Sequence, residues 1–135
     1  MKYIKVFIAG MIFPSIILPC LLFIAWISGR SQLLMIPFVH FIPLIWGAWN
    51  VLYFSYFTHA LPGNTAIKLL ITGGILGLLM AIYGVFVLDL PILVGLRDSS
   101  TYLPLIVAPI LYALLWLWVV NPLNRVLGVS ETKDN

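Results

Sequence analysis

The sequence predicts an all-α integral membrane protein built as a bundle of four transmembrane helices. Hydrophobic residues make up 63% of the 135 residues and charged residues only 8%, against about 25% charged in an ordinary soluble domain. The apolar residues also fall into runs of about 20 residues, the helix length that crosses a hydrocarbon core about 30 Å thick. Backbone groups in lipid must be hydrogen-bonded internally, so each run is predicted to be a helix.

The four predicted spans lie within a single domain of residues 1–135. They cover about residues 6–28, 33–57, 66–88 and 102–120. Turn-forming residues occupy 29–32 and 59–65. The first span is expected to be retained rather than cleaved as a signal peptide, because Pro19 stands where a small residue precedes a cleavage site. Residues 121–135 are expected to form a short cytoplasmic tail, with the fourth helix ending or bending at Pro122.

The connection between the third and fourth spans is the least regular. Residues 89–96 are too apolar for a free loop and too short to cross a bilayer. We therefore expect a short segment lying in the membrane interface.

Basic residues near the span ends predict the orientation. The side that holds both termini has Lys2, Lys5, Lys68, Arg125 and Lys133, and the opposite side has Arg30 and Arg97. Cytoplasmic loops carry an excess of Lys and Arg, so both termini are expected in the cytoplasm. The small size and the basic-residue bias favour the plasma (inner) membrane of a bacterium.

Three of the four predicted helices contain prolines beyond their first turn. These prolines are Pro14 and Pro19 in the first span, Pro43 in the second and Pro109 in the fourth. Such a proline removes one backbone hydrogen bond and bends the helix. Three kinked helices are therefore expected, and kinks open room in a bundle core.

The second span holds the candidate ligand-binding residues. At about 100° per residue, one side of this helix carries His40, Pro43, Gly47, Asn50, Phe54 and Thr58. We expect this side to face the bundle, with His40, Gly47, Asn50 and Phe54 forming a notch that binds a substrate or a lipid headgroup. The alternative is that His40 and Asn50 only hold neighbouring helices together by hydrogen bonds.

Aromatic residues are expected at surfaces and span ends. The other side of the second span, with Trp46, Trp49, Tyr53 and Tyr56, is expected to be a lipid-facing or packing surface. Three further tryptophans, expected to be interfacial anchors, are Trp26, Trp116 and Trp118.

The third span contains the helix-packing residues Gly73, Gly77 and Gly84. The Gly73-x-x-x-Gly77 spacing lets two helix backbones approach closely. We expect a contact within the chain, with a dimer seam as the alternative.

The sequence offers few groups for chemistry. No Asp, Glu, Lys or Arg lies in the middle of a predicted span, and the single cysteine excludes a Cys-x-x-Cys pair. His40 and His59 are 19 residues apart, about 28 Å along one helix, and cannot bind one haem iron together. No catalytic residue, metal or cofactor is predicted, and nucleic-acid binding is excluded by the lack of charge.

These observations favour a non-enzymatic membrane protein that binds lipid, a small hydrophobic molecule or a partner membrane protein, including a second copy of itself. The alternative is a small transporter or channel that works as an oligomer assembled through the Gly73, Gly77 and Gly84 stripe. A third hypothesis is an enzyme acting on lipid at the interface. It would use Asp89, Arg97 and Asp98 on one side, or Asn121 and Arg125 on the other.

Overall fold

The computed structural model describes residues 1–129, which fold entirely into helices and short connections, with no strand in that range. The helices are α1 (Lys2–Ile27), η1 (Ser31–Met35), α2 (Pro37–Leu52), η2 (Tyr53–Phe57), α3 (Thr58–Ala60), α4 (Thr65–Phe86), α5 (Leu90–Leu93), η3 (Asp98–Tyr102), α6 (Pro104–Leu115), η4 (Trp116–Val120) and α7 (Asn121–Val126). Four helical runs are long and apolar enough to cross a membrane, namely Lys2–Ile27, Pro37–Ala60, Thr65–Phe86 and Ser100–Val126. The prediction of four such helices is confirmed.

Local sequence signals explain where the helices begin. The Asn64 side chain accepts a hydrogen bond of 3.0 Å from the Ile67 N–H, and α4 starts at the next residue, Thr65. Both α2 and α6 start with a proline, Pro37 and Pro104, at a position whose N–H has no helical partner.

The fourth helical run continues past residue 120, where the predicted span ended, and past Pro122. Pro122 has no N–H to donate to the carbonyl one turn earlier, and its ring crowds that carbonyl. The five residues before α7, Trp116–Val120, form a wider π-helical turn, which makes room for the proline. Helix α7 therefore adds Asn121–Val126 to the run. The rest of the predicted tail, residues 130–135 with Lys133, lies outside the described residues.

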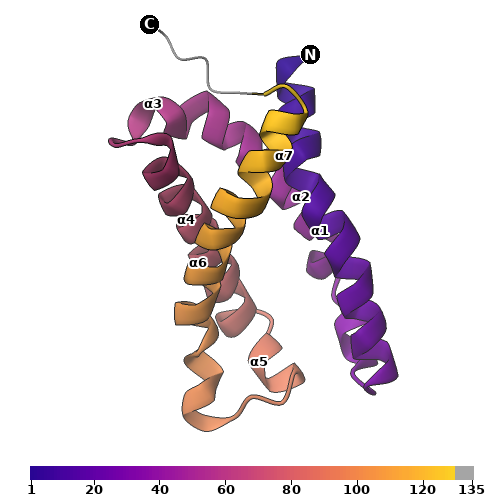
Figure 1. Cartoon of the computed structure of the whole chain (residues 1–135). Coiled ribbons are helices and arrows are strands. Elements are labelled where there is room, and N and C mark those ends of the chain that lie inside the picture. Colours follow the sequence, from indigo (N-terminus) through magenta and orange to yellow (C-terminus); the bar gives the residue numbers. More distant parts are fainter. Residues whose placement is uncertain (130–135) are drawn as a thin grey trace, which may run out of the picture.

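The helices pack as two pairs. The most extensive contacts join α4 to α6 and α1 to α2, while η4 and α7 contact α1 and link one pair to the other. Figure 1 shows the pairs close together near the chain termini and diverging toward the opposite end, where α5 lies.

A glycine seam allows each pair to pack closely. A Cβ added at Gly10 would lie 2.6 Å from the Trp46 carbonyl oxygen and 3.0 Å from the Gly47 Cα. A Cβ at Gly73 would lie 2.6 Å from the Tyr112 carbonyl oxygen. Both distances are too short for a real side chain, so only glycine permits these two crossings.

The core between the pairs is aromatic. Its fully buried residues are Trp46, Tyr53, Leu69, Leu76, Trp116 and Val120. The ring centroids of Trp46 and Trp116 lie 5.0 Å apart. Trp116 is 0% exposed and Trp118 is 69% exposed, so the expectation of an interfacial anchor is wrong for Trp116. Because the helix runs on through α7, Trp116 lies well inside it rather than at its end.

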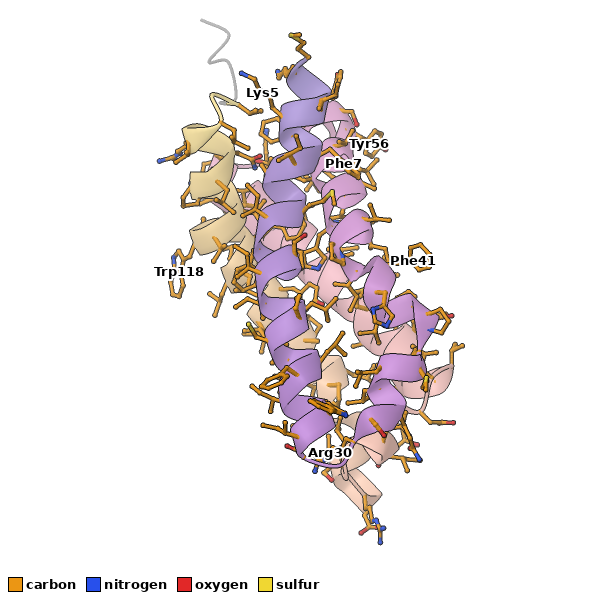
Figure 2. All side chains as sticks on the ribbon, turned by 90° about the vertical axis from the view of Figure 1, so that its right-hand side faces the viewer. Lys5, Phe7, Arg30, Phe41, Tyr56 and Trp118 are labelled. Atoms are coloured by element: carbon orange, nitrogen blue, oxygen red, sulfur yellow. The ribbon has the colours of Figure 1, made fainter. Side chains whose placement is uncertain are left out.

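Large apolar side chains cover the outside of the helices as well. Figure 2 shows Phe41, Tyr56 and Trp118 pointing away from the ribbon, and all three are exposed. The labelled basic residues Lys5 and Arg30 lie toward opposite ends of α1. Apolar residues outside as well as inside are typical of a helix bundle surrounded by lipid.

Candidate functional site

The structure does not bring the four predicted notch residues together. Gly47 and Asn50 are buried between helices, and Phe54 is half-buried, with the Lys2 Nζ 6.0 Å from its ring centroid. His40 is exposed, and its Nε2 lies 2.9 Å from the Leu34 carbonyl oxygen. The prediction that His40 faces the bundle is therefore wrong, because the η1 turn supplies its hydrogen-bond partner locally.

Two aromatic residues of the second helical run lie on its buried face. Trp46 and Tyr53, from the side expected to be a lipid-facing or packing surface, are 2% and 1% exposed. Their rings fill the space between the helix pairs, where they remove more apolar area from lipid or water than the small residues of the opposite side. That side of the helix is therefore a packing surface at these two positions.

Asn50 forms a buried polar node with α1 and α7. Its Nδ2 donates to the Val6 carbonyl oxygen at 2.7 Å and to Asn124 Oδ1 at 2.8 Å. Asn124 Nδ2 donates back to Asn50 Oδ1 at 3.2 Å. The two amides satisfy each other and tie three helices together near the chain termini. Both donors of the Asn50 amide have acceptors within the chain, so the geometry of this node is that of a structural link.

A second polar link joins α2 to α4. Trp49 Nε1 donates to the Thr72 carbonyl oxygen at 3.0 Å, and Thr72 Oγ1 donates to the Lys68 carbonyl oxygen at 2.7 Å. The Lys68 ammonium donates to the Thr58 carbonyl oxygen. The two helix pairs are thus held by hydrogen bonds at the end that carries the termini.

An apolar cleft separates the pairs farther from the termini, and we call it the inter-pair cleft. One pocket of about 270 Å³ lies between α2, α4, α5 and α6. Another of about 300 Å³ lies between α1, α2 and α6. Ile42 and Tyr112 line both pockets, so the two pockets lie side by side, and we treat them together as one cleft. An apolar cavity of about 150 Å³ accepts a benzene ring, so each side has room for a larger apolar group.

The walls of the inter-pair cleft come from every long helix. The first pocket includes Phe38, Val39, Met80, Pro91, Val94 and Ala108, and the second includes Phe13, Ile17, Leu18, Trp46, Leu111 and Leu115. Among these lining residues, only Trp46 and Tyr112 have side chains that can form hydrogen bonds. The cleft therefore suits a molecule that is almost entirely hydrocarbon.

The predicted glycine stripe serves two different contacts. Gly73 and Gly77 face α6, where a Cβ at Gly77 would lie 2.5 Å from the Ala108 carbonyl oxygen. A Cβ at Gly84 would instead lie 3.2 Å from Leu90 Cδ1, and Gly84 lines the first pocket. The stripe thus packs against this chain's own helices.

The charged residues of the connections lie at the open end of the pairs. The Arg30 guanidinium lies beside Gly95, 3.5 Å from where a Cβ would stand, so the α1–η1 and α5–η3 connections meet there. Asp89 and Asp98 both have left-handed backbone conformations. Within residues 1–129, no group of three or more His, Cys, Asp or Glu residues could hold a metal ion.

Three residues of these sites carried no clear signal in the sequence. Asn124 lay beyond the predicted fourth span, Gly10 is one small residue in a long apolar run, and Tyr112 is one aromatic residue among many. A helix continued through Pro122 would have placed Asn124 one turn from Val120, on the same face.

Comparison with protein-family models, curated proteins and solved structures finds no significant match to this chain. The class that the fold defines is an all-helical protein with four helices long and apolar enough to span a membrane.

Proposed function

We propose that this chain is a multi-pass membrane protein that binds a hydrophobic molecule in the inter-pair cleft and acts by holding it. The observation that carries the proposal is the pair of apolar pockets that share Ile42 and Tyr112 between the two helix pairs. The exposed large apolar side chains on the outside of the helices support insertion of all four helices in a bilayer. In that setting the cleft is reached directly from the hydrocarbon phase.

The proposed location is the plasma (inner) membrane of a bacterium, with both termini in the cytoplasm, on the basic-residue argument given above. The first pocket would then lie toward the non-cytoplasmic side, since it is lined by Leu90 and Pro91 of α5, and α5 lies at the end opposite the termini (Figure 1). Pro14 lines the cleft, and a bend of α1 at this residue is our proposed cause of the divergence of the pairs.

Binding is favoured over chemistry by the lining of the cleft. Its lining residues hold no carboxylate, imidazole, thiol or amine, and their one ionisable group is the Tyr112 phenol, so the lining lacks a paired acid and base and an activated nucleophile. The transporter alternative needed an exposed glycine stripe for assembly, and Gly73 and Gly77 are already in contact with α6. An interfacial enzyme receives no support from Asp89 or Asp98, since neither lines the cleft.

Native mass spectrometry of the full chain released from mild detergent tests this proposal. We expect a reproducible bound mass on the wild-type protein. Leu18→Trp and Val94→Trp each place a large ring in one pocket and should remove that mass. Phe23→Trp is the matched control, because Phe23 is exposed and lines neither pocket.

A bound mass that persists in both pocket-filling variants would show that the cleft is not the site. A wild-type protein that is released without any bound mass, as a defined oligomer, would favour the partner-binding or transporter alternative.

A further inference from the structure

Two residues that line the inter-pair cleft, Trp46 and Tyr112, carry hydrogen-bond donors, and in the described part of the chain one of these donors has no partner. Trp46 Nε1 is buried and has no hydrogen-bond partner. The Tyr112 side chain is close enough to Trp46 to interact with it, although Trp46 Nε1 does not form a hydrogen bond. The two ring centroids lie 5.1 Å apart.

Both residues line the cleft, although the Trp46 Nε1 atom itself is buried. Trp46 and Tyr112 line the pocket between α1, α2 and α6, and Tyr112 also lines the pocket between α2, α4, α5 and α6. Every other lining residue is apolar. An unpaired donor is costly to bury in a setting without water, so an acceptor arriving with the ligand would be bound here and nowhere else in the cleft.

The geometry allows one acceptor to satisfy both groups. The Tyr112 hydroxyl can donate its proton to a ligand oxygen while its own oxygen accepts from the Trp46 N–H. A small approach of the two rings completes the second bond, and two linked hydrogen bonds polarise each other. A carbonyl oxygen, which accepts and does not donate, fits this arrangement.

The position of Tyr112 along its membrane-spanning helix limits which carbonyl compounds could reach it. Tyr112 lies near the middle of the Ser100–Val126 run, about 18 Å along the helix from Ser100 at 1.5 Å per residue. The carbonyls of bilayer-forming glycerolipids lie at the edge of the hydrocarbon core, about 15 Å from its centre. The matching carbonyl therefore belongs to a molecule that dissolves within the core.

Resting on the proposed function, we infer that the cleft selects a lipophilic carbonyl compound, held by its oxygen at Tyr112 and Trp46 with its hydrocarbon part along the two pockets. Two kinds of core-dissolved molecule supply this chemistry, a quinone with an alkyl tail and a neutral fatty ester. They share the carbonyl acceptor and the long apolar body.

The test measures quenching of the intrinsic tryptophan fluorescence of the full chain in nanodiscs. The probes are methyl dibromostearate, dibromo-octadecane and decylubiquinone. The first two differ mainly in the ester group, so they separate recognition of the carbonyl from simple partition into the cleft. Each probe is titrated into the wild type, Tyr112→Phe and Tyr102→Phe. Tyr102 is the matched control, because it is exposed and lines neither pocket.

We expect Tyr112→Phe to weaken binding of at least one carbonyl probe by about fivefold, the worth of one ordinary hydrogen bond. Dibromo-octadecane should bind the wild type and Tyr112→Phe equally, and Tyr102→Phe should bind all three probes as the wild type does. A loss confined to decylubiquinone identifies a quinone site, and a loss confined to the bromoester identifies an ester site. Isotope-edited infrared spectra should show a lower carbonyl stretching frequency for the bound probe, with the shift absent in Tyr112→Phe.

Equal binding of all three probes to the wild type and Tyr112→Phe would overturn this inference and leave the cleft as an unselective apolar site. Absence of binding by every probe to the wild type would instead overturn the proposed function itself. Tyr112→Phe keeps the ring that packs against Trp46, so the variant retains its packing, and an unchanged unfolding midpoint checks this.

Discussion

Replacement of Gly77 by alanine tests whether the glycine seam of α4 is an internal contact. The new Cβ would lie 2.5 Å from the Ala108 carbonyl oxygen and 2.8 Å from Tyr112 Cβ, whereas ordinary contact begins near 3.4 Å. The neighbouring atoms are backbone and Cβ, which no rotamer change can move. Helices α4 and α6 must therefore separate by about 0.9 Å, which loosens dispersion contacts along their whole crossing.

Gly74→Ala is the matched control for this change. A Cβ at Gly74 would lie 3.7 Å from the Pro109 carbonyl oxygen and 3.9 Å from Ala113 Cβ, so it fits without movement. Both variants gain the same helix propensity over glycine. The difference between their free energies of unfolding then reports only the overpacking at Gly77, which we expect to be about 1–3 kcal/mol.

The assay is reversible unfolding in mixed micelles by titration with sodium dodecyl sulfate, followed by tryptophan fluorescence. We expect Gly77→Ala to unfold at a lower detergent fraction than Gly74→Ala, with a midpoint independent of protein concentration. Equal free energies for the two variants would refute the close α4–α6 crossing. A midpoint that rises with protein concentration only when Gly77 is intact would place Gly77 in a dimer seam instead.

Further predictions concern the polar links. Asn50→Leu should lower the free energy of unfolding by about 1–3 kcal/mol, because it leaves the Asn124 amide buried and unpaired. The Asn50→Leu/Asn124→Leu double variant should recover part of this loss in the same titration. Additive losses from the two substitutions would contradict a reciprocal pair. Trp49→Phe should lower the free energy of unfolding by about 1 kcal/mol, because it removes the hydrogen bond to the Thr72 carbonyl. The same detergent titration measures this loss against the wild type, and an unchanged free energy would show that this bond does not hold the pairs together. His40→Phe should change stability by less than about 0.5 kcal/mol and leave the bound mass intact, since its side chain is exposed, and loss of that mass would return His40 to the binding site.

The number and approximate extent of the helices could be predicted because they depend on composition over long windows. About 20 apolar residues in a row have one stable form in lipid, whatever their order. The face that each helix turns inward depends on smaller differences. In α2 one polar residue, Asn50, is buried as expected, but His40 is not, because it finds its partner in the Leu34 carbonyl just before the helix.

The polar node and the cleft depend on contacts between distant parts of the chain. Asn50 and Asn124 are 74 residues apart, and no local pattern pairs them. Their meeting also required the helix to pass Pro122, which the π-helical turn before it allows. The role that we propose for Tyr112 depends on the divergence of the two pairs, which is a property of the tertiary arrangement.

The pairing of the helices has a consequence for the order of folding. Each pair joins long helices that are separated along the chain only by short elements, so its contacts close small loops at little entropic cost. Helix α7 meets α1 across nearly the whole sequence, so this contact closes the largest loop and we expect it to form last. Two membrane-inserted hairpins would then precede the native bundle, and Asn124 would be the residue that finally docks one hairpin on the other.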